Sequence, residues 1–392
     1  MERAVIVSTA RTPIAKAFKG AFSATHGVTL AGHAIAHAVE RSGVERERIE
    51  DVVLGCGMPE GATGMNIGRH AAMRAGLPQS VAGATVMRAC ASGLNAIAVA
   101  AQQIMVGGAE TLVAGGVESI SLVQPLRART TVKEEWLETH LSDIYMSMND
   151  TAQVVATRYN ISRHSQDEYA LLSQTRTAAA QKEGRFDAEI VPLRTTKPIE
   201  DPKTGIVTTE EIKLLKDEGN RPSTTSESLS ALNPIKEGYT ITAGNASQLS
   251  DGASAAVLMS DTFAEKNGLE PLGAFVDFCV AGNDPAEMGI APVFAIPKLL
   301  KRNRLTVSDI DLWEINEAYA CQVLYIAQRL DIPLERLNVD GGAISVGHPF
   351  GMTGARQVGH ILLEGRRRKV RYAVVAMCIA GGMGAAALLE VF

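Results

Sequence analysis

Two regions of this 392-residue chain repeat the same order of elements, and this repetition restricts the possible folds more than any other feature. In each region an apolar strand is followed by a segment of small residues with a cysteine or histidine, an apolar helix, a second strand and a glycine turn. The strands are expected at 51–55 and 111–114 in the first region and at 311–315 and 372–376 in the second. A period this long is not that of a solenoid. The repetition predicts an internal duplication of an α/β unit, with two unrelated α/β units as the alternative.

The duplication also predicts where the helices and the remaining residues lie. The helix of each region is apolar on more than one side and is therefore expected to be enclosed between sheets. Residues 121–248 break the pattern with charge runs, an amphipathic stretch at 151–183 and a polar segment at 197–228. Long insertions are usually functional covers, and we expect this one to lie over the first half and the active site. The predicted organisation is a first half at 1–120, an inserted loop domain at 121–248, a return to the first half at 249–270 and a second half at 271–392.

Charge and cysteine content exclude several classes of protein. The net charge of −5 argues against nucleic acid or an anionic membrane as the main partner, although a local basic pocket for a phosphorylated cofactor stays possible. No apolar run approaches the ~20 residues of a membrane span, and residues 1–8 read as a strand rather than as a signal. The five cysteines are odd in number and scattered, which argues against disulfides or a zinc site. We expect a cytoplasmic enzyme without a metal.

Four residues stand where catalytic groups are usually found. Cys90 lies at the start of a helix, where the macrodipole is expected to lower its thiol pKa toward neutrality. His348 lies in a glycine-bounded turn, where its imidazole could take the Cys90 proton. Cys378 follows a buried strand, and Asn316 closes another strand, where its amide could orient a water or donate to an oxyanion. The remaining cysteines are interpreted as small buried hydrophobes: Cys56, Cys279 and Cys321.

These segments resemble the thiolase family over the range Val5 to Val391, and they occur in the family order. The matching stretches are ARTPI (10–14), ACASG (89–93), GGVESIS (115–121), TAGNAS (242–247), NEAY (316–319), GHPFG (347–351) and CIAGGMG (378–384). The resemblance implies a five-layered α/β/α/β/α sandwich of two duplicated halves with an inserted loop domain. It also implies coenzyme A and acyl-CoA as substrates, no permanently bound cofactor, and a homodimer or homotetramer. A partner hydratase/dehydrogenase of β-oxidation is possible.

The resemblance assigns roles position by position. Cys90 would be the nucleophile that becomes acylated, and His348 would activate it. Cys378 would be the acid/base at the acetyl α-carbon. Asn316 would hold the water of one oxyanion hole together with His348, and the backbone N–H groups of Cys90 and Ala380 would form the second hole. Residues matching those that contact coenzyme A or the substrate are Arg221, Ser228, Ala243, Ser247 and Met148.

Three departures from the family pattern affect the expected function. Ala380 replaces a nearly constant glycine, so its Cβ is expected to strain that turn. Met87 stands where asparagine is common before the nucleophile. Ser147 stands where acetoacetyl-CoA-forming members usually carry histidine, and residues 217–225 resemble degradative members. Ser147 and the 217–225 segment favour thiolytic cleavage of 3-ketoacyl-CoA, with biosynthetic acetoacetyl-CoA formation by an acetyl-CoA acetyltransferase as the alternative.

Other classes of protein explain fewer of these residues. A thiol-protease triad would use Cys90, His348 and Asn316 but would give no role to Cys378 or to the duplication. A ketoacyl synthase would carry a second histidine site in place of Cys378. A coenzyme A-binding protein without catalysis would need neither thiol. Acyl-CoA thioesters tested against peptides would separate these classes.

Overall fold

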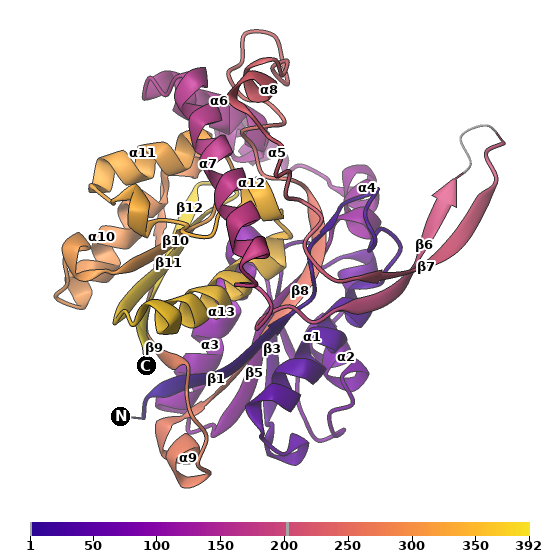
Figure 1. Cartoon of the computed structure of the whole chain (residues 1–392), viewed down its shortest axis with the longest axis vertical. Helices are drawn as coiled ribbons and strands as arrows, with labels where there is room; N and C mark the ends of the chain where they lie inside the picture. Colours follow the sequence, from indigo (N-terminus) through magenta and orange to yellow (C-terminus); the bar gives the residue numbers. More distant parts are fainter. Residues whose placement is uncertain (1, 201–203) are drawn as a thin grey trace.

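A mixed ten-stranded sheet runs through the whole protein in the computed structural model, which describes residues 2–200 and 204–392 (Figure 1). Its strand order is β10-β11-β12-β9-β1-β8-β5-β3-β4, and β2 pairs with β8. The strands of the first half are β1 (Ala4–Arg11), β2 (Ala15–Lys16), β3 (Asp51–Cys56), β4 (Ala84–Val86), β5 (Thr111–Ser119) and β8 (Ser250–Ser260). Those of the second half are β9 (Gly273–Gly282), β10 (Leu312–Ile315), β11 (Tyr372–Ile379) and β12 (Met383–Val391).

The pairing pattern confirms the predicted duplication. In the first half β3 pairs parallel with β5, which pairs antiparallel with β8, which pairs antiparallel with β1. In the second half β10, β11, β12 and β9 are joined in the same sequence of parallel, antiparallel and antiparallel pairs. The two half-sheets meet where β1 pairs with β9. The fold is therefore one mixed unit used twice.

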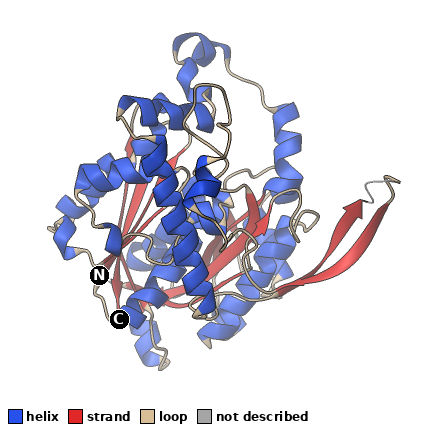
Figure 2. Cartoon of the chain, turned by 45° about the horizontal axis from the view of Figure 1, so that its top comes forward, coloured by secondary structure: helices blue, strands red, loops and turns tan. Residues whose placement is uncertain are grey.

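Helices cover both half-sheets and fill the space between them, which gives the five layers (Figures 1 and 2). The outer helices are α1 (Gly27–Ser42) and α2 (Ile67–Arg74) on the first half, and α10 (Pro292–Arg302) and α11 (Ala320–Leu330) on the second. The central layer contains α3 (Ser92–Gly107) and α13 (Phe350–Arg368). Successive strand residues point to opposite faces, so Val374 packs against the outer layer and Val375 against the central one.

The stretch Ala89–Gly107, which contains α3, is long and apolar enough to cross a membrane by length and composition. In the protein it is enclosed in the central layer, where residues such as Leu94, Ile97 and Ile104 are buried in the core. Its apolar composition is explained by sheets on both sides, as the sequence predicts.

Two predicted turns are strand in the structure. Gly115 and Gly116 lie inside β5, which continues to Ser119, and Cys378 lies inside β11. A Cβ atom on Gly116 would lie 1.8 Å from the carbonyl oxygen of Gly351 in α13. Gly116 therefore serves a close approach of helix to strand rather than a turn, and Gly115 serves a close approach of the neighbouring strand β8.

The segment between β5 and β8 forms its own group of elements. Its parts are α4 (Ile120–Thr130), α5 (Glu135–His140), η4 (Ser142–Tyr145), α6 (Met148–Arg158), α7 (Arg163–Lys182), β6 (Leu193–Glu200), β7 (Val207–Leu214) and α8 (Ser226–Ser230). The prediction that this segment lies over the first half is wrong for its long helices. Helices α6 and α7 pack on α11, and α7 also packs on α12 (Ala343–Val346), all in the second half. The β6–β7 hairpin extends away from the body (Figures 1 and 2).

The remaining short helices connect these layers. They are α9 (Asp261–Lys266), η1 (Arg46–Arg48), η2 (Gly61–Thr63), η3 (Ala89–Ala91), η5 (Pro285–Ile290), η6 (Val307–Asp309) and η7 (Leu334–Arg336).

A buried cluster of charges joins both halves to the inserted segment. Arg11 of β1 binds Glu189 at 2.7 Å and Asp217 at 2.7 Å, and His360 of α13 binds Glu189 at 3.0 Å and Asp340 at 3.4 Å. Burial alone would raise the pKa of Glu189, but Arg11 and His360 outweigh it and lower that pKa to about 2. Burial alone would lower the pKa of His360, but Glu189 and Asp340 outweigh it and raise that pKa to about 10. Glu189 and His360 are therefore both charged at neutral pH.

Glu189→Gln should lower the free energy of unfolding by about 3–5 kcal/mol, because it leaves buried cations with one anion fewer. The pKa of Glu189 falls from 4.5 to about 2 on folding, so its stabilisation is complete above pH 4.5 and is lost as pH falls toward 2. The pKa of His360 rises from 6.5 to about 10, so its stabilisation is complete below pH 6.5 and is lost as pH rises through 10. Urea denaturation at several pH values should find the largest difference between pH 4.5 and 6.5.

The matched control is Glu110→Gln, which removes an ion pair of 2.9 Å with Arg48 in which both side chains are about half exposed. Exposed pairs contribute about 0–1 kcal/mol, so this variant should unfold near the wild-type midpoint. Equal losses in the two variants would contradict the role given to the buried cluster.

Candidate active site

Cys90 lies in the single turn η3 that leads directly into α3, and only 6% of its surface is exposed. The turn is fixed by Ser92, whose hydroxyl donates to the carbonyl of Ala89 at 2.6 Å and accepts from the N–H of Arg88 at 2.8 Å. Ala89 has a φ of 43°, in the left-handed region that alanine rarely adopts. Strained residues of this kind gather at functional sites, and this one immediately precedes the predicted nucleophile.

The prediction that the thiol pKa of Cys90 is lowered toward neutrality is wrong for the unliganded protein. Burial raises this pKa far above its ordinary value, and the neighbouring Cys378 and Glu118 raise it further. The backbone N–H groups of Cys90 and Ala380 act in the opposite direction, because both face the sulfur. A helix start lowers a thiol pKa when water also reaches the sulfur, and here burial dominates. Cys90 therefore rests as a thiol and needs a base.

His348 has the protonation state of such a base. Its Nδ1 lies 2.6 Å from the hydroxyl of Thr353, and that hydroxyl donates its own proton to the carbonyl of Pro349 at 2.9 Å. This hydrogen-bond network assigns the imidazole proton to Nδ1 and makes Nε2 the acceptor nitrogen of the ring. Burial, with a smaller effect of Arg356, lowers the pKa of His348 to about 3. The ring is therefore neutral at rest.

Asn316 faces the same imidazole. Its Nδ2 lies 3.2 Å from Nε2 of His348, and its backbone N–H donates to Ala376 at 2.9 Å at the end of β10. Its Oδ1 is buried and has no hydrogen-bond partner in the described ranges 2–200 and 204–392. An unpaired buried amide oxygen is costly, so this atom is ready to accept from a water or a ligand.

Cys378 is the second thiol at this site. It is fully buried near the end of β11, where Nε2 of Gln322 donates to its sulfur at 3.1 Å. Burial raises the pKa of Cys378 to about 11, although Gln322 and the residue's own N–H oppose the rise. Two thiols on elements of different halves therefore lie within electrostatic range of each other.

Sequence reasoning missed two residues that hold the catalytic groups in place. Gln322 is a polar residue on the buried face of the apolar helix α11, and this contrast could have identified it. Thr353 lies four residues after Pro349 on α13, so helical spacing returns its hydroxyl to the histidine. Neither residue belongs to a segment quoted for the family resemblance.

The structure brings some of the predicted binding residues to the thiols and leaves others apart. Met148 packs against the cluster that contains Cys378, and the N–H of Ser247 donates to Ala318 at 2.9 Å beside the NEAY segment. The other three are exposed on the inserted segment: Arg221, Ser228 and Ala243. The Ser228 hydroxyl is engaged in the capping box of α8, whereas no ion pair or hydrogen bond engages the Arg221 guanidinium within the described part of the chain.

The expected strain at Ala380 is absent. Ala380 is exposed and does not have a positive φ, since the left-handed positions of this turn are taken by Gly381 (85°) and Gly382 (83°). Alanine therefore fits here without cost, and its N–H still faces Cys90. Met87, the other departure near the nucleophile, is 52% exposed.

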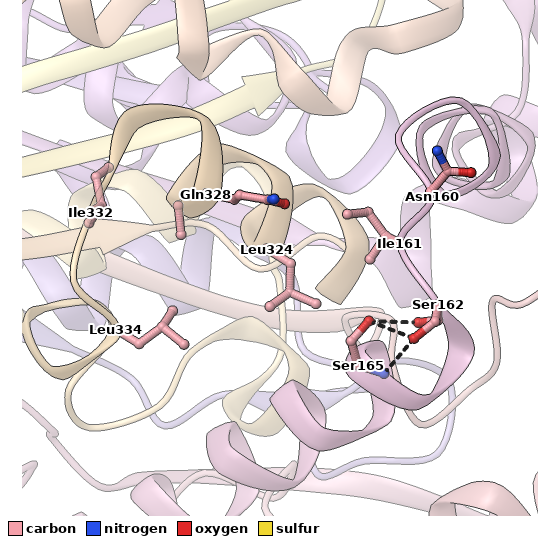
Figure 3. A pocket seen from close by; sticks show the side chains of 9 residues that line it. Asn160, Ile161, Ser162, Ser165, Leu324, Gln328, Ile332 and Leu334 are labelled. Carbon is pink, nitrogen blue, oxygen red and sulfur yellow. Dashed lines mark hydrogen bonds between the residues drawn. The ribbon is translucent and has the colours of Figure 1, made fainter.

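A separate surface pocket has a volume of about 380 Å³, and Figure 3 shows the side chains that line it. It lies between the α6–α7 connection and α11 and is lined by Asn160, Ile161, Ser162, Ser165, Leu324, Ala327, Gln328, Ile332 and Leu334. None of the predicted site residues lines it. The remaining cysteines are buried free thiols, as expected: Cys56, Cys279 and Cys321.

Comparisons with known proteins agree with this geometry. Residues 4–262 match the model of the thiolase N-terminal domain, and residues 269–391 match that of the thiolase C-terminal domain. The chain is 42% identical to a 3-ketoacyl-CoA thiolase of Bacillus subtilis, with 100% of each chain covered. The structure resembles the acetyl-CoA acetyltransferase of Bacillus anthracis (TM-score 0.89, 37% identity, 100% and 99% covered). It also resembles the dimeric peroxisomal thiolase of Saccharomyces cerevisiae (TM-score 0.89, 37% identity, 100% and 98% covered).

The two domain models together cover nearly the whole chain. The matched ranges include the two thiols, the neutral histidine and both halves of the duplicated sheet. The chain belongs to the thiolase family of acyltransferases.

Proposed function

We propose that this protein cleaves 3-ketoacyl-CoA with coenzyme A, giving acetyl-CoA and a shortened acyl-CoA through an acyl-cysteine intermediate. The observation that carries the proposal is the electrostatic interaction of two buried thiols, Cys90 and Cys378. The neutral base His348 is linked to Cys378 through the contacts of Asn316 and Gln322. The B. subtilis relative bears the name of this activity. Coenzyme A enters as a substrate, and the steps below need no permanently bound cofactor.

In the first half-reaction His348 takes the proton of Cys90, whose sulfur attacks the 3-keto carbonyl carbon. The C2–C3 bond then breaks, and the acetyl-CoA enolate accepts the proton of Cys378 at its carbon. In the second half-reaction coenzyme A gives its thiol proton to the Cys378 thiolate and attacks the acyl group. Cys90 leaves as a thiolate and recovers its proton from His348, which restores all three residues.

Two sets of donors stabilise the negative charge that develops on oxygen. Asn316 would hold a water through its buried Oδ1. This water and the protonated Nε2 of His348 would donate hydrogen bonds to one of the two thioester or ketone oxygens that become negatively charged. The N–H groups of Cys90 and Ala380 serve the other oxygen, in agreement with their approach to the Cys90 sulfur. In a buried site such preorganised donors are worth more than in water.

The remaining assignments concern binding and location. Coenzyme A would lie along Arg221, Ser228, Ala243 and Ser247, and the acyl chain would lie beside Met148. The unpaired Arg221 guanidinium suits a phosphate. We place the enzyme in the cytoplasm as a homodimer or homotetramer, with a hydratase/dehydrogenase as a possible partner. The yeast neighbour is dimeric, whereas several eukaryotic relatives, such as that of the mouse, are peroxisomal.

The second candidate is acetoacetyl-CoA formation from two acetyl-CoA molecules. The structural likeness to the B. anthracis acetyl-CoA acetyltransferase favours it. The reaction is the reverse of thiolysis and would use the same residues, so only substrate preference separates the two.

Cys378→Ala should still form an acyl adduct on Cys90 from acyl-CoA, detectable by mass spectrometry. It should lower thiolysis by ~10²–10⁴-fold, because the acid for the enolate is missing. Exchange of the acetyl methyl protons with deuterated water should also disappear. The control is Cys321→Ala, which removes a buried thiol that donates to Ala152 at 3.4 Å and should leave exchange intact. Wild-type exchange in Cys378→Ala would assign the base to another group.

Ala380→Gly should change kcat by less than about twofold, because the alanine Cβ is exposed and its φ is not one that favours glycine. Ala380→Pro removes the N–H itself and should lower kcat by ~10²–10³-fold, the loss expected for one oxyanion donor. Steady-state thiolysis of both variants checks this. A large fall in the glycine variant would show that the site depends on the alanine side chain.

Medium and longer 3-ketoacyl-CoAs should be better substrates than acetoacetyl-CoA. Ser147 leaves space where the acetoacetyl-specific relatives carry histidine, and Met148 can adapt to different chains. Each buried methylene contributes ~0.8 kcal/mol, so kcat/KM should rise about fourfold per methylene until the channel ends. Thiolysis across a series of chain lengths measures this. A maximum at acetoacetyl-CoA with a sharp fall beyond it would favour the biosynthetic alternative.

A further inference from the structure

Glu118 is a buried carboxylate between the nucleophile and the base, and the steps above give it no role. It lies near the end of β5 with none of its surface exposed. Its Oε2 accepts from the N–H groups of Gly57 and Gly351, each at 2.9 Å, and its Oε1 accepts from the N–H of Met58 at 3.2 Å. One carboxylate therefore binds the turn after β3 and the first turn of α13.

These contacts are at the junction of the two catalytic segments. A Cβ atom on Gly57 would lie 2.7 Å from Oε2 of Glu118, 2.8 Å from Cβ of Phe350 and 3.2 Å from the carbonyl oxygen of Ala89. Ala89 precedes Cys90, and Phe350 is two residues after His348. The turn at Gly57 is thus packed between the nucleophile turn and the histidine segment. Glu118 fixes this turn by accepting hydrogen bonds from its backbone N–H groups.

The Glu118 carboxylate also interacts electrostatically with the Cys90 thiol. Burial raises the pKa of Glu118 to about 7, while its three backbone donors oppose the rise. Glu118 in turn raises the thiol pKa of Cys90. The other titratable groups here are Cys56 of β3, whose sulfur is 3.8 Å from Oε1 of Glu118, and Cys378 and Tyr319, which interact with Cys90.

We propose that Glu118 is a positioning residue that holds Cys90 opposite His348 and keeps Cys90 protonated until substrate arrives. Its backbone contacts set the geometry, and its negative charge opposes a thiolate in the free enzyme. The role rests on the proposed function of Cys90 and His348. Its consequence is a nucleophile that reacts poorly with oxidants and alkylating agents in the resting state.

The test measures alkylation of Cys90 by iodoacetamide as a function of pH, quantified by mass spectrometry in a Cys378→Ala background. Glu118→Gln keeps a carbonyl oxygen for Gly57 and Gly351 but removes the charge. Alkylation at mildly alkaline pH should become about tenfold faster, and the pH profile should move to lower pH by about one unit. Because no acyl-CoA is present, this result is independent of whether the enzyme performs thiolysis.

The control for loss of a buried carboxylate is Asp251→Asn on β8. Burial raises the pKa of Asp251 too, but Asp251 is not among the groups that raise the thiol pKa of Cys90. Its alkylation profile should match that of the background. An alkylation-versus-pH profile of Glu118→Gln that does not move would overturn the electrostatic part of the proposal. So would an alkylation rate that rises equally at every pH, because greater exposure of the Cys90 sulfur alone does not shift the midpoint of the profile.

Glu118→Asp in the otherwise wild-type chain tests the positioning part and covers the case in which the glutamine variant does not fold. Aspartate keeps the charge but is one methylene shorter, so it cannot reach all three N–H groups. Thiolysis kcat should fall at least about tenfold, while the alkylation profile of the Glu118→Asp, Cys378→Ala double variant stays at the background position. Wild-type kcat in Glu118→Asp would overturn the positioning role.

Discussion

The structure depends on a backbone contact between the two central helices and the sheet below them. A Cβ atom on Gly93 of α3 would lie 2.4 Å from the carbonyl oxygen of Gly351, and one on Gly351 would lie 2.2 Å from that of Val117 in β5. Only glycine allows such proximity. Because α3 and α13 touch at their first turns, the residues that precede them meet at one end of the central layer. This contact brings Cys90 and His348 together from positions more than half the chain apart.

Enclosure in that layer determines the chemistry at rest. Cys90, Cys378 and His348 are all buried, so each holds its neutral form, with raised thiol pKa values and a lowered imidazole pKa. Charge therefore develops during the reaction and not before it. The low-dielectric surroundings that suppress a resting thiolate also strengthen the donors around it. The two thiols and the histidine are neutral at rest. In the charge cluster around Glu189, by contrast, ion-pair partners keep Glu189 and His360 ionised despite burial.

The features that repeat or are local could be predicted from the sequence. Apolar periodicity predicts the strands and the enclosed central helices, and small residues around Cys90, His348 and Cys378 identify the catalytic segments. The features that depend on distant packing could not be predicted. The pKa of Cys90 is controlled by the elements that bury it, Gly116 is explained only by α13 lying across it, and the insertion packs on the second half. Gln322 and Thr353 acquire their roles from tertiary proximity to residues already identified.

The pairing of β1 affects how the chain reaches its native state. Ala4 pairs with Ser260 on one side and with Phe275 on the other. During synthesis the first strand therefore waits for more than half of the polypeptide to emerge before it gains either neighbour. Contacts of such long sequence separation slow folding and leave strand edges exposed to other nascent chains. For this protein, the edges of β1 are therefore open to other chains, or to a chaperone that binds apolar strands, until β8 and β9 have been made.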